Sequence, residues 1–143
     1  MDELQAAVLN VKFLHLERWT EARRRNARRY DSLFEETGLA EHIQVPVVRD
    51  GNRHIFHQYV IRVPHRDKLR EFLRANGVGT EVYYPIPLHR QACFAGLPRH
   101  ADPCPVAERA AATSLALPIY GELILAQQRH VVRAIAEFYD QRR

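Results

Sequence analysis

The chain has 143 residues, of which 46% are hydrophobic and 27% charged, and its formal net charge is +4. This is the composition of an ordinary globular domain with one core. No run approaches the roughly twenty apolar residues of a membrane span, and the first residues do not resemble a signal peptide. We therefore expect a cytoplasmic protein that does not bind membranes. Cys93 and Cys104 are too few for a disulfide scaffold, so we expect free thiols.

Large or apolar residues spaced three or four apart predict one long helix over residues 2–37. No Pro or Gly interrupts it, and Gly38 ends it. At ~1.5 Å per residue such a helix would be about 54 Å long, whereas a domain of this size has a radius of gyration of ~14–15 Å. We therefore expect part of the helix to project or to lie against another body.

Two strands are predicted next, over residues 42–48 and 54–63, and the turn-forming Asp50 and Gly51 between them favour an antiparallel hairpin. A helix over residues 66–76 ends at Gly77, and a third strand is predicted over residues 79–84.

A further helix over residues 104–116 opens at Pro105, which suits the first helical position. Residues 115–120 could instead be extended before Pro118, and an amphipathic helix over residues 125–141 closes the chain. The order of elements predicts an α+β fold, with a small, mainly antiparallel sheet of about three strands packed against helices. We expect a single domain over residues 1–143, with residues 1–38 forming its N-terminal helix.

A loop rich in tyrosine and proline is the strongest candidate site. Pro85 and Pro87 end the preceding strand in a stiff, extended segment that carries Tyr83, Tyr84 and His89. Such loops on a rigid scaffold often bind ligands. The alternative is a rigid connector whose tyrosines pack in the core.

The central predicted strand carries a second candidate. Alternation places His57 and Tyr59 on one face, with Phe56, Gln58 and Val60 on the other. His57 and Tyr59 could position a ligand or a neighbouring loop, or could form a half-polar packed face.

Two further patterns, one of possible metal ligands and one of arginines, are better explained without a metal site or a nucleic-acid site. His89, Cys93, His100 and Cys104 are possible zinc ligands, but their spacing matches no known finger, and we predict no metal site. The arginines of the first helix are interleaved with Glu17 and Glu21, which favours a solvated face over a nucleic-acid footprint. These arginines are Arg18, Arg23, Arg24, Arg25, Arg28 and Arg29.

Several stretches together resemble the C-terminal part of a pyridoxal-phosphate sugar aminotransferase of the DegT/DnrJ/StrS type. They are MDELQAA at residues 1–7, FHQYVIRVP at 56–64, the segment 66–89 that ends in EVYYPIPLH, PVAERAA at 105–111 and LALPIY at 115–120. The resemblance covers essentially the whole chain.

The resemblance implies an enzyme that moves an amino group from glutamate or glutamine onto a keto-sugar, typically nucleotide-linked, with pyridoxal phosphate as the electron carrier. In that family the cofactor lysine and most phosphate ligands belong to a large N-terminal domain. Neither of the two lysines of this chain, Lys12 and Lys68, resembles the cofactor lysine. We therefore expect no catalytic residue here, no cofactor bound to this chain alone, and no activity of the chain by itself.

The positions carried over as substrate contacts are Tyr83, Tyr84 and His89, and with less support His57 and Tyr59. The expected partners are a sugar substrate in the full enzyme and either a large domain or further copies of the chain. Nucleic acid is not an expected partner. The alternative is a non-catalytic module, derived from such a domain, that binds a ligand or a partner.

Overall fold

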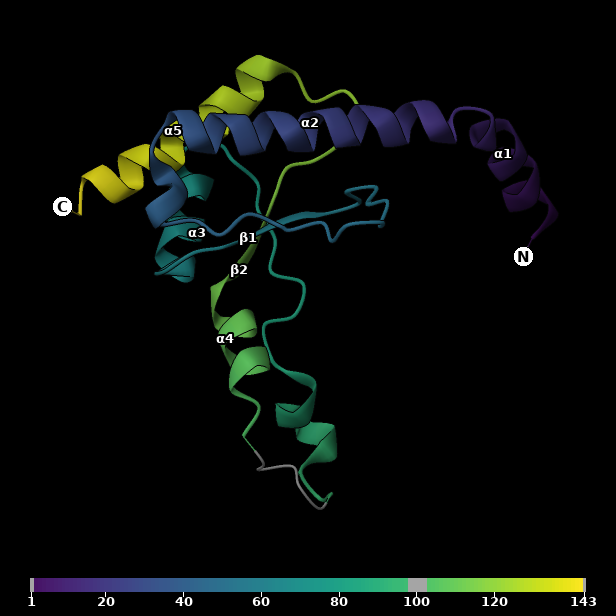
Figure 1. The fold of residues 1–143 in the computed structure, drawn as a ribbon. Coiled ribbons are helices and arrows are strands. Elements are labelled where there is room, and N and C mark those ends of the chain that lie inside the picture. Colours follow the sequence, from purple (N-terminus) through teal and green to yellow (C-terminus); the bar gives the residue numbers. More distant parts are fainter. Residues whose placement is uncertain (1, 98–102, 143) are drawn as a thin grey trace.

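The computed structural model describes residues 2–97 and 103–142. In chain order its elements are α1 (Glu3–Phe13), α2 (Leu16–Glu36), β1 (Tyr59–Arg62), α3 (Arg66–Ala75), α4 (Pro105–Thr113), β2 (Ser114–Leu117) and α5 (Leu125–Asp140), with 3-10 turns at Leu39–Glu41, Leu88–Arg90 and Ala92–Phe94. Figure 1 shows α2 along the top of the molecule, the two strands at its centre, and α4 with the facing 3-10 turns as a lobe that extends away from the helices. Among the described residues no helix is both long and apolar enough to cross a membrane.

The sheet is antiparallel and small, as predicted, but its strands differ from the expected ones. β1 pairs with β2 in the register Tyr59↔Leu117 to Arg62↔Ser114. The predicted strands at 42–48 and 79–84 are each reduced to one bridge, Gln44↔Arg62 and Glu81↔Ala116. The α+β class is therefore confirmed, and the three-strand sheet becomes two strands with a bridge on either side.

The helix predicted over 104–116 begins at Pro105 but ends at Thr113, because Ser114–Leu117 form β2 instead. The buried guanidinium of Arg66 donates to the carbonyls of Ala111 and Ser114, at 3.1 and 2.8 Å. These bonds satisfy carbonyl groups where the helix gives way to the strand. The extended alternative that the sequence left open for residues 115–120 is therefore the correct one for residues 115–117, and Arg66, which is distant in sequence, supports the switch from helix to strand.

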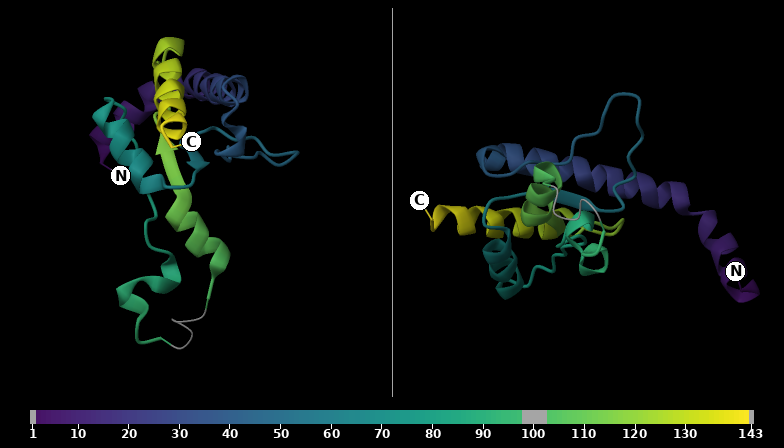
Figure 2. Two further views of the ribbon diagram at one scale, coloured as in Figure 1. Left: turned by 90° about the vertical axis from the view of Figure 1, so that its left-hand side faces the viewer. Right: turned by 90° about the horizontal axis from the view of Figure 1, so that it is seen from below.

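Helices α2, α3 and α5 pack on one face of the sheet. The two views of Figure 2 show α2, α3 and α5 around the strands, and the left view shows the α4 lobe directed away from them. The core between these helices and the sheet contains large side chains with less than 2% exposure, including Tyr30, Tyr59, Ile61, Leu69, Leu73, Leu115 and Ile135. Truncation of such a buried leucine or isoleucine to alanine typically costs about 2–5 kcal/mol of stability.

Buried polar side chains join α2 to α5. The Gln128 amide donates to the carbonyl of Asn26 at 2.7 Å, and the Asn26 amide donates to the carbonyl of Tyr120 at 2.8 Å. Both side chains are at most 1% exposed. The hydrogen bonds of these two NH2 groups fix how α5 and the segment before it lie on α2, because a buried donor without a partner would carry its full desolvation cost.

The single long N-terminal helix was a wrong prediction. The helical segment breaks at Leu14 and His15 into α1 and α2, and α1 has no buried residue. Its apolar side chains are exposed, Leu4 by 79% and Val11 by 65%. Most helical stability in proteins comes from packing of an apolar face, and α1 has no buried apolar face that would hold it in line with α2. The predicted ends of α2 and α3 are confirmed, with Gly38 and Gly77 at φ of 67° and 74°.

The hydroxyl of Tyr59 ties the sheet to α2 by donating to Asp31 Oδ1 at 2.5 Å. Burial raises the pKa of the Asp31 carboxyl above its ordinary value, although the bond from Tyr59 acts in the opposite direction. The folded protein therefore binds more protons at this site than the unfolded chain as the pH rises above the ordinary aspartate range. The associated stability is present at low pH and is lost as the pH rises through the raised pKa.

We predict that Asp31→Asn gains stability relative to wild type as the pH rises from about 4 to 7, because asparagine still accepts from Tyr59 but never ionises. The free energy of unfolding is measured by denaturant titration at several pH values. Tyr59→Phe, which removes the donor, should show a steeper decline with pH than wild type. Parallel pH profiles for Asp31→Asn and wild type would contradict the prediction.

The start of α5 lacks a side-chain cap. Ile124 occupies the N-cap and is 58% exposed, while Gln127 Oε1 accepts from the Ile124 backbone N–H at 3.1 Å.

We predict that Ile124→Ser stabilises the chain by about 0.5–2 kcal/mol, because serine adds the missing acceptor for the first-turn amides. The measurement is the denaturant midpoint at unchanged slope. Ile124→Ala is the matched control, and an equal gain from both variants would show that capping is not the cause.

Candidate substrate cleft

The open face of the sheet forms the floor of a cleft of about 460 Å³. Gln58, Val60, Ser114 and Ala116 line it from the two strands and their ends. One wall is the segment from Glu81 to Gln91, and the other is α4, through Ala107, Ala110 and Ala111. The volume is in the range of small-ligand sites.

The shape of the cleft follows from local sequence. Ala107, Ala110 and Ala111 recur at helical spacing, so α4 presents a smooth wall of methyl groups to the cleft. On the opposite side, Pro85 and Pro87 keep the loop extended before the turn at Leu88–Arg90. A helix and a stiff loop therefore face each other across the sheet.

A second hollow of about 350 Å³ adjoins the first and has a more polar lining. It is lined by His57, Thr80 and Leu117 among others, and it shares Gln58, Glu81, Tyr83 and Ala116 with the cleft. Glu81 is held in place by two backbone hydrogen bonds to Ala116, at 3.1 and 2.8 Å. Gln58 and Glu81 are thus polar groups common to both hollows, at the junction of an apolar and a polar compartment.

The structure places Tyr83 and Tyr84 in the cleft lining, with exposed fractions of 50% and 80%. They do not pack in the core, which was the alternative considered from sequence. Their rings can therefore be reached by a ligand in the cleft.

His89 lies apart from the cleft lining. Its Nε2 is 3.0 Å from Glu108 Oε1 of α4, and the Arg90 guanidinium approaches the same oxygen at 3.2 Å. The hydrogen bonds from His89 and then from Arg90 lower the pKa of Glu108. These contacts join the loop to α4 across the lobe, so the observed contacts of His89 hold the cleft walls together.

His57 and Tyr59 do not share a face, contrary to the alternation expected from sequence. Phe56 has a φ of 49°, and β1 begins only at Tyr59, so the extended pattern does not run through His57. His57 lines the second hollow. Tyr59 is fully buried against α2 and lines neither hollow, so its role as a substrate contact stays a prediction.

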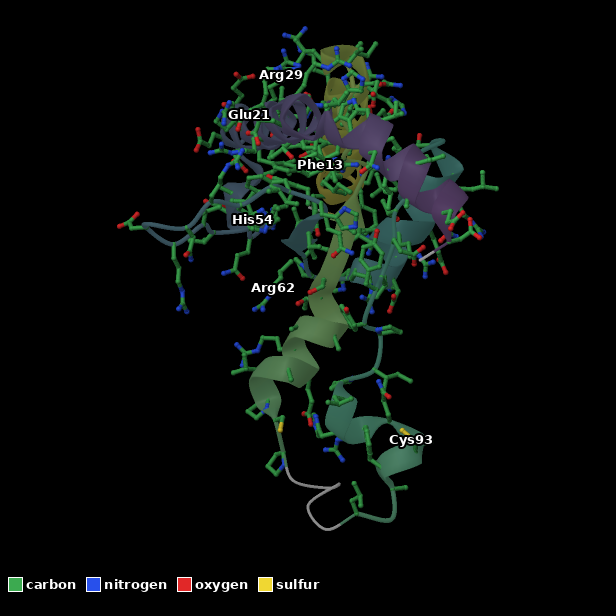
Figure 3. The ribbon with its side chains drawn as sticks, turned by 90° about the vertical axis from the view of Figure 1, so that its right-hand side faces the viewer. Phe13, Glu21, Arg29, His54, Arg62 and Cys93 are labelled. Atoms are coloured by element: carbon green, nitrogen blue, oxygen red, sulfur yellow. The ribbon has the colours of Figure 1, made fainter. Side chains whose placement is uncertain are left out.

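The cysteines are free and exposed. Figure 3 shows Cys93 on the lobe, at the opposite end of the molecule from Arg29. His100, one of the four possible zinc ligands, lies outside the described residues. Among residues 2–97 and 103–142, no group of three or more His, Cys, Asp or Glu side chains could hold a metal ion.

Sequence reasoning missed Gln58, Glu81 and the alanines of α4. The A-x-x-A-A spacing of residues 107–111 is a usable signal, since it predicts a small-residue face on a helix. Gln58 and Glu81 carried no comparable signal, because their position depends on the pairing of the strands.

The model of the DegT/DnrJ/EryC1/StrS aminotransferase family matches residues 1–136. A pleiotropic regulatory protein of Geobacillus stearothermophilus is 50% identical over 139 residues, covering 97% of this chain and 37% of that protein. A dTDP-3-amino-3,4,6-trideoxy-alpha-D-glucose transaminase of Micromonospora megalomicea is 35% identical over 138 residues, covering 96% and 37%.

Solved structures of the same family have a similar fold. An aminotransferase of this family from Brucella abortus superposes with a TM-score of 0.85 at 36% identity, covering 96% of this chain and 36% of that one. NtdA from Bacillus subtilis, solved with bound cofactor PMP, gives a TM-score of 0.79 at 28% identity, covering 99% and 33%. The chain thus spans about a third of the length of the relatives it matches. The match along nearly its whole length shows that this chain belongs to the DegT/DnrJ/EryC1/StrS family of pyridoxal-phosphate-dependent sugar aminotransferases.

Proposed function

We propose that this chain forms the substrate-side wall of an aminotransferase site that acts on a nucleotide-linked keto-sugar, with glutamate or glutamine as the amino donor. The observation that carries the proposal is the two-part cleft on the open face of the sheet, which offers apolar walls, two accessible tyrosines and the polar pair Gln58 and Glu81. A sugar ring suits such a lining, because its hydroxyls need fixed donors and acceptors while its carbon skeleton packs on flat side chains.

The residues of this chain do not fit a pyridoxal phosphate site. That cofactor supplies an electron sink, and enzymes hold it through a lysine amine. The two lysines of the chain, Lys12 and Lys68, are both exposed and line neither hollow. The Lys12 ammonium instead lies 5.9 Å from the centre of the Trp19 ring. The proposal therefore assigns to this chain only the binding and orientation of the sugar, and the cofactor to the part of the relatives that this chain does not match.

The exposed apolar side chains on α1 support the proposal that this helix binds a partner. Leu4, Val8, Val11 and Phe13 are each more than half exposed, and exposed apolar patches of this kind mark interaction surfaces. We propose that this helix contacts either a large domain or another copy of the chain. The alternative function, a non-catalytic module that binds a ligand or a partner, uses the same cleft and the same helix without the cofactor chemistry.

We predict that dTDP-glucose binds in the cleft of the 143-residue chain and perturbs the tyrosine ring signals in NMR spectra. Tyr83→Phe should weaken binding by about two- to tenfold, the value of one hydrogen bond. Tyr120→Phe is the matched control, because Tyr120 is a tyrosine outside both hollows, and it should bind as wild type does. Equal effects of the two variants, or saturation with no change at Tyr83 or Tyr84, would contradict the assignment of the cleft.

We further predict that pyridoxal phosphate forms no stoichiometric adduct with this chain. The test is to add the cofactor, record the visible spectrum, reduce with borohydride and map any label by mass spectrometry. Trace labelling distributed over surface amines is the expected result, because neither lysine is desolvated beside a binding cleft. A full equivalent of label at Lys12 or Lys68 would overturn the view that the cofactor is held elsewhere. Sugar binding without such an adduct is the result that both predictions require.

A further inference from the structure

A hollow between α2 and α5 gathers four arginines. Arg25, Arg28 and Arg29 enter it from α2 and Arg129 enters it from α5, around a volume of about 360 Å³. Leu33 and Leu125 supply apolar surface, Ser32 a hydroxyl, and Glu36 an opposing charge. The lining therefore carries four positive charges against one negative charge.

Most of this positive charge is not neutralised within the protein. Arg29 donates to the neutral side-chain oxygen of Asn26 at 3.3 Å. Across residues 2–97 and 103–142, no acidic side chain lies within ion-pair distance of Arg25, Arg28 or Arg129. Arg24 of α2 differs in this respect, since it pairs with Glu21 at 2.6 Å.

The scaffold around the hollow is rigid. Asn26 and Gln128, which are the buried amides that join α2 to α5, lie directly beside it in sequence. The hydrogen bond between them fixes the spacing of the two helices. The arginines therefore converge from two firmly packed elements, and less backbone freedom is lost on binding than for arginines on a mobile loop.

We propose that this hollow is a binding site for a small phosphate-bearing anion, separate from the sugar cleft. Guanidinium groups pair with phosphate oxygens through two parallel hydrogen bonds, and several such groups around one hollow suit a group of two or more negative charges. A small ligand fits better than nucleic acid, because Glu21, Asp31 and Glu35 interleave on the same helix and would repel an extended polyanion. No lining residue is shared with the cleft or the hollow beside it, and Figure 3 shows Arg29 at the far end of the molecule from the lobe.

The test uses the full chain and pyrophosphate as the probe, followed by calorimetry and backbone NMR at about 0.15 M ionic strength, where non-specific attraction is screened. One equivalent should bind, with shifts confined to α2 from Arg25 to Glu36 and to the first turns of α5. The double variant Arg25→Gln/Arg28→Gln should weaken binding at least about tenfold, since each lost guanidinium removes charge-assisted hydrogen bonds. Arg129→Gln, on the other helix, should weaken it independently.

The matched control is Arg18→Gln/Arg70→Gln, which makes the same change in net charge at exposed positions outside the hollow. It should bind pyrophosphate within about twofold of wild type. Repeating the titration with inorganic phosphate and with dTDP separates recognition of the phosphate alone from recognition of a nucleotide. The proposal would be overturned if the control and test variants weakened binding equally, or if none of the three probes bound. It would also be overturned if duplex DNA bound more tightly than the probes and both double variants weakened that binding equally.

Discussion

The antiparallel pairing of β1 with β2 is the contact on which the other elements of this structure depend. Residues 59–62 and 114–117 are distant in sequence, yet their register places Tyr59, Ile61, Leu115 and Leu117 on the helical side. A one-residue shift would move this entire set to the opposite face. The buried Arg66 opposes such a shift, because its bonds to Ala111 and Ser114 fix where α4 ends and β2 begins. The register therefore decides both which side chains form the core and which ones face the cleft.

Covering only one face of the sheet leaves the other face available for binding. Val60 and Ala116 are opposite each other in the register and both line the cleft. The α4 lobe stands over this face without filling it, and the contacts of Glu108 with His89 and Arg90 keep its two sides together. The cleft is thus a product of the fold itself and does not require a special insertion.

The sequence permitted prediction of the features that depend on neighbouring residues. Gly38 and Gly77 end helices as expected, Pro105 opens one, and α5 covers nearly the predicted residues. Tyr83 and Tyr84 line the cleft, and they lie in a loop whose prolines and aromatic residues are a local signal. The features that failed depend on distant contacts. The break at Leu14 and His15 carries no Pro or Gly, and it reflects missing packing on α1. His57 and Tyr59 do not share a face because Phe56 leaves the extended conformation, and the helix predicted to residue 116 ends earlier because Arg66 binds the carbonyls at the start of β2 from elsewhere in the chain.

The position of the lobe also bears on how the cleft can change during evolution. Its 3-10 turns and α4 lie on the connection between Glu81, which bridges to β2, and β2 itself. Both ends of this connection are anchored to the sheet, so its length can vary with little effect on the core. Doubling the length of a flexible loop costs only about 0.6 kcal/mol of closure entropy, which is far less than the loss of one buried leucine. Insertions and deletions in the lobe would reshape the walls of the cleft while the helices and strands kept their packing. The shape of the cleft walls and the packing of the core are therefore largely uncoupled in this architecture.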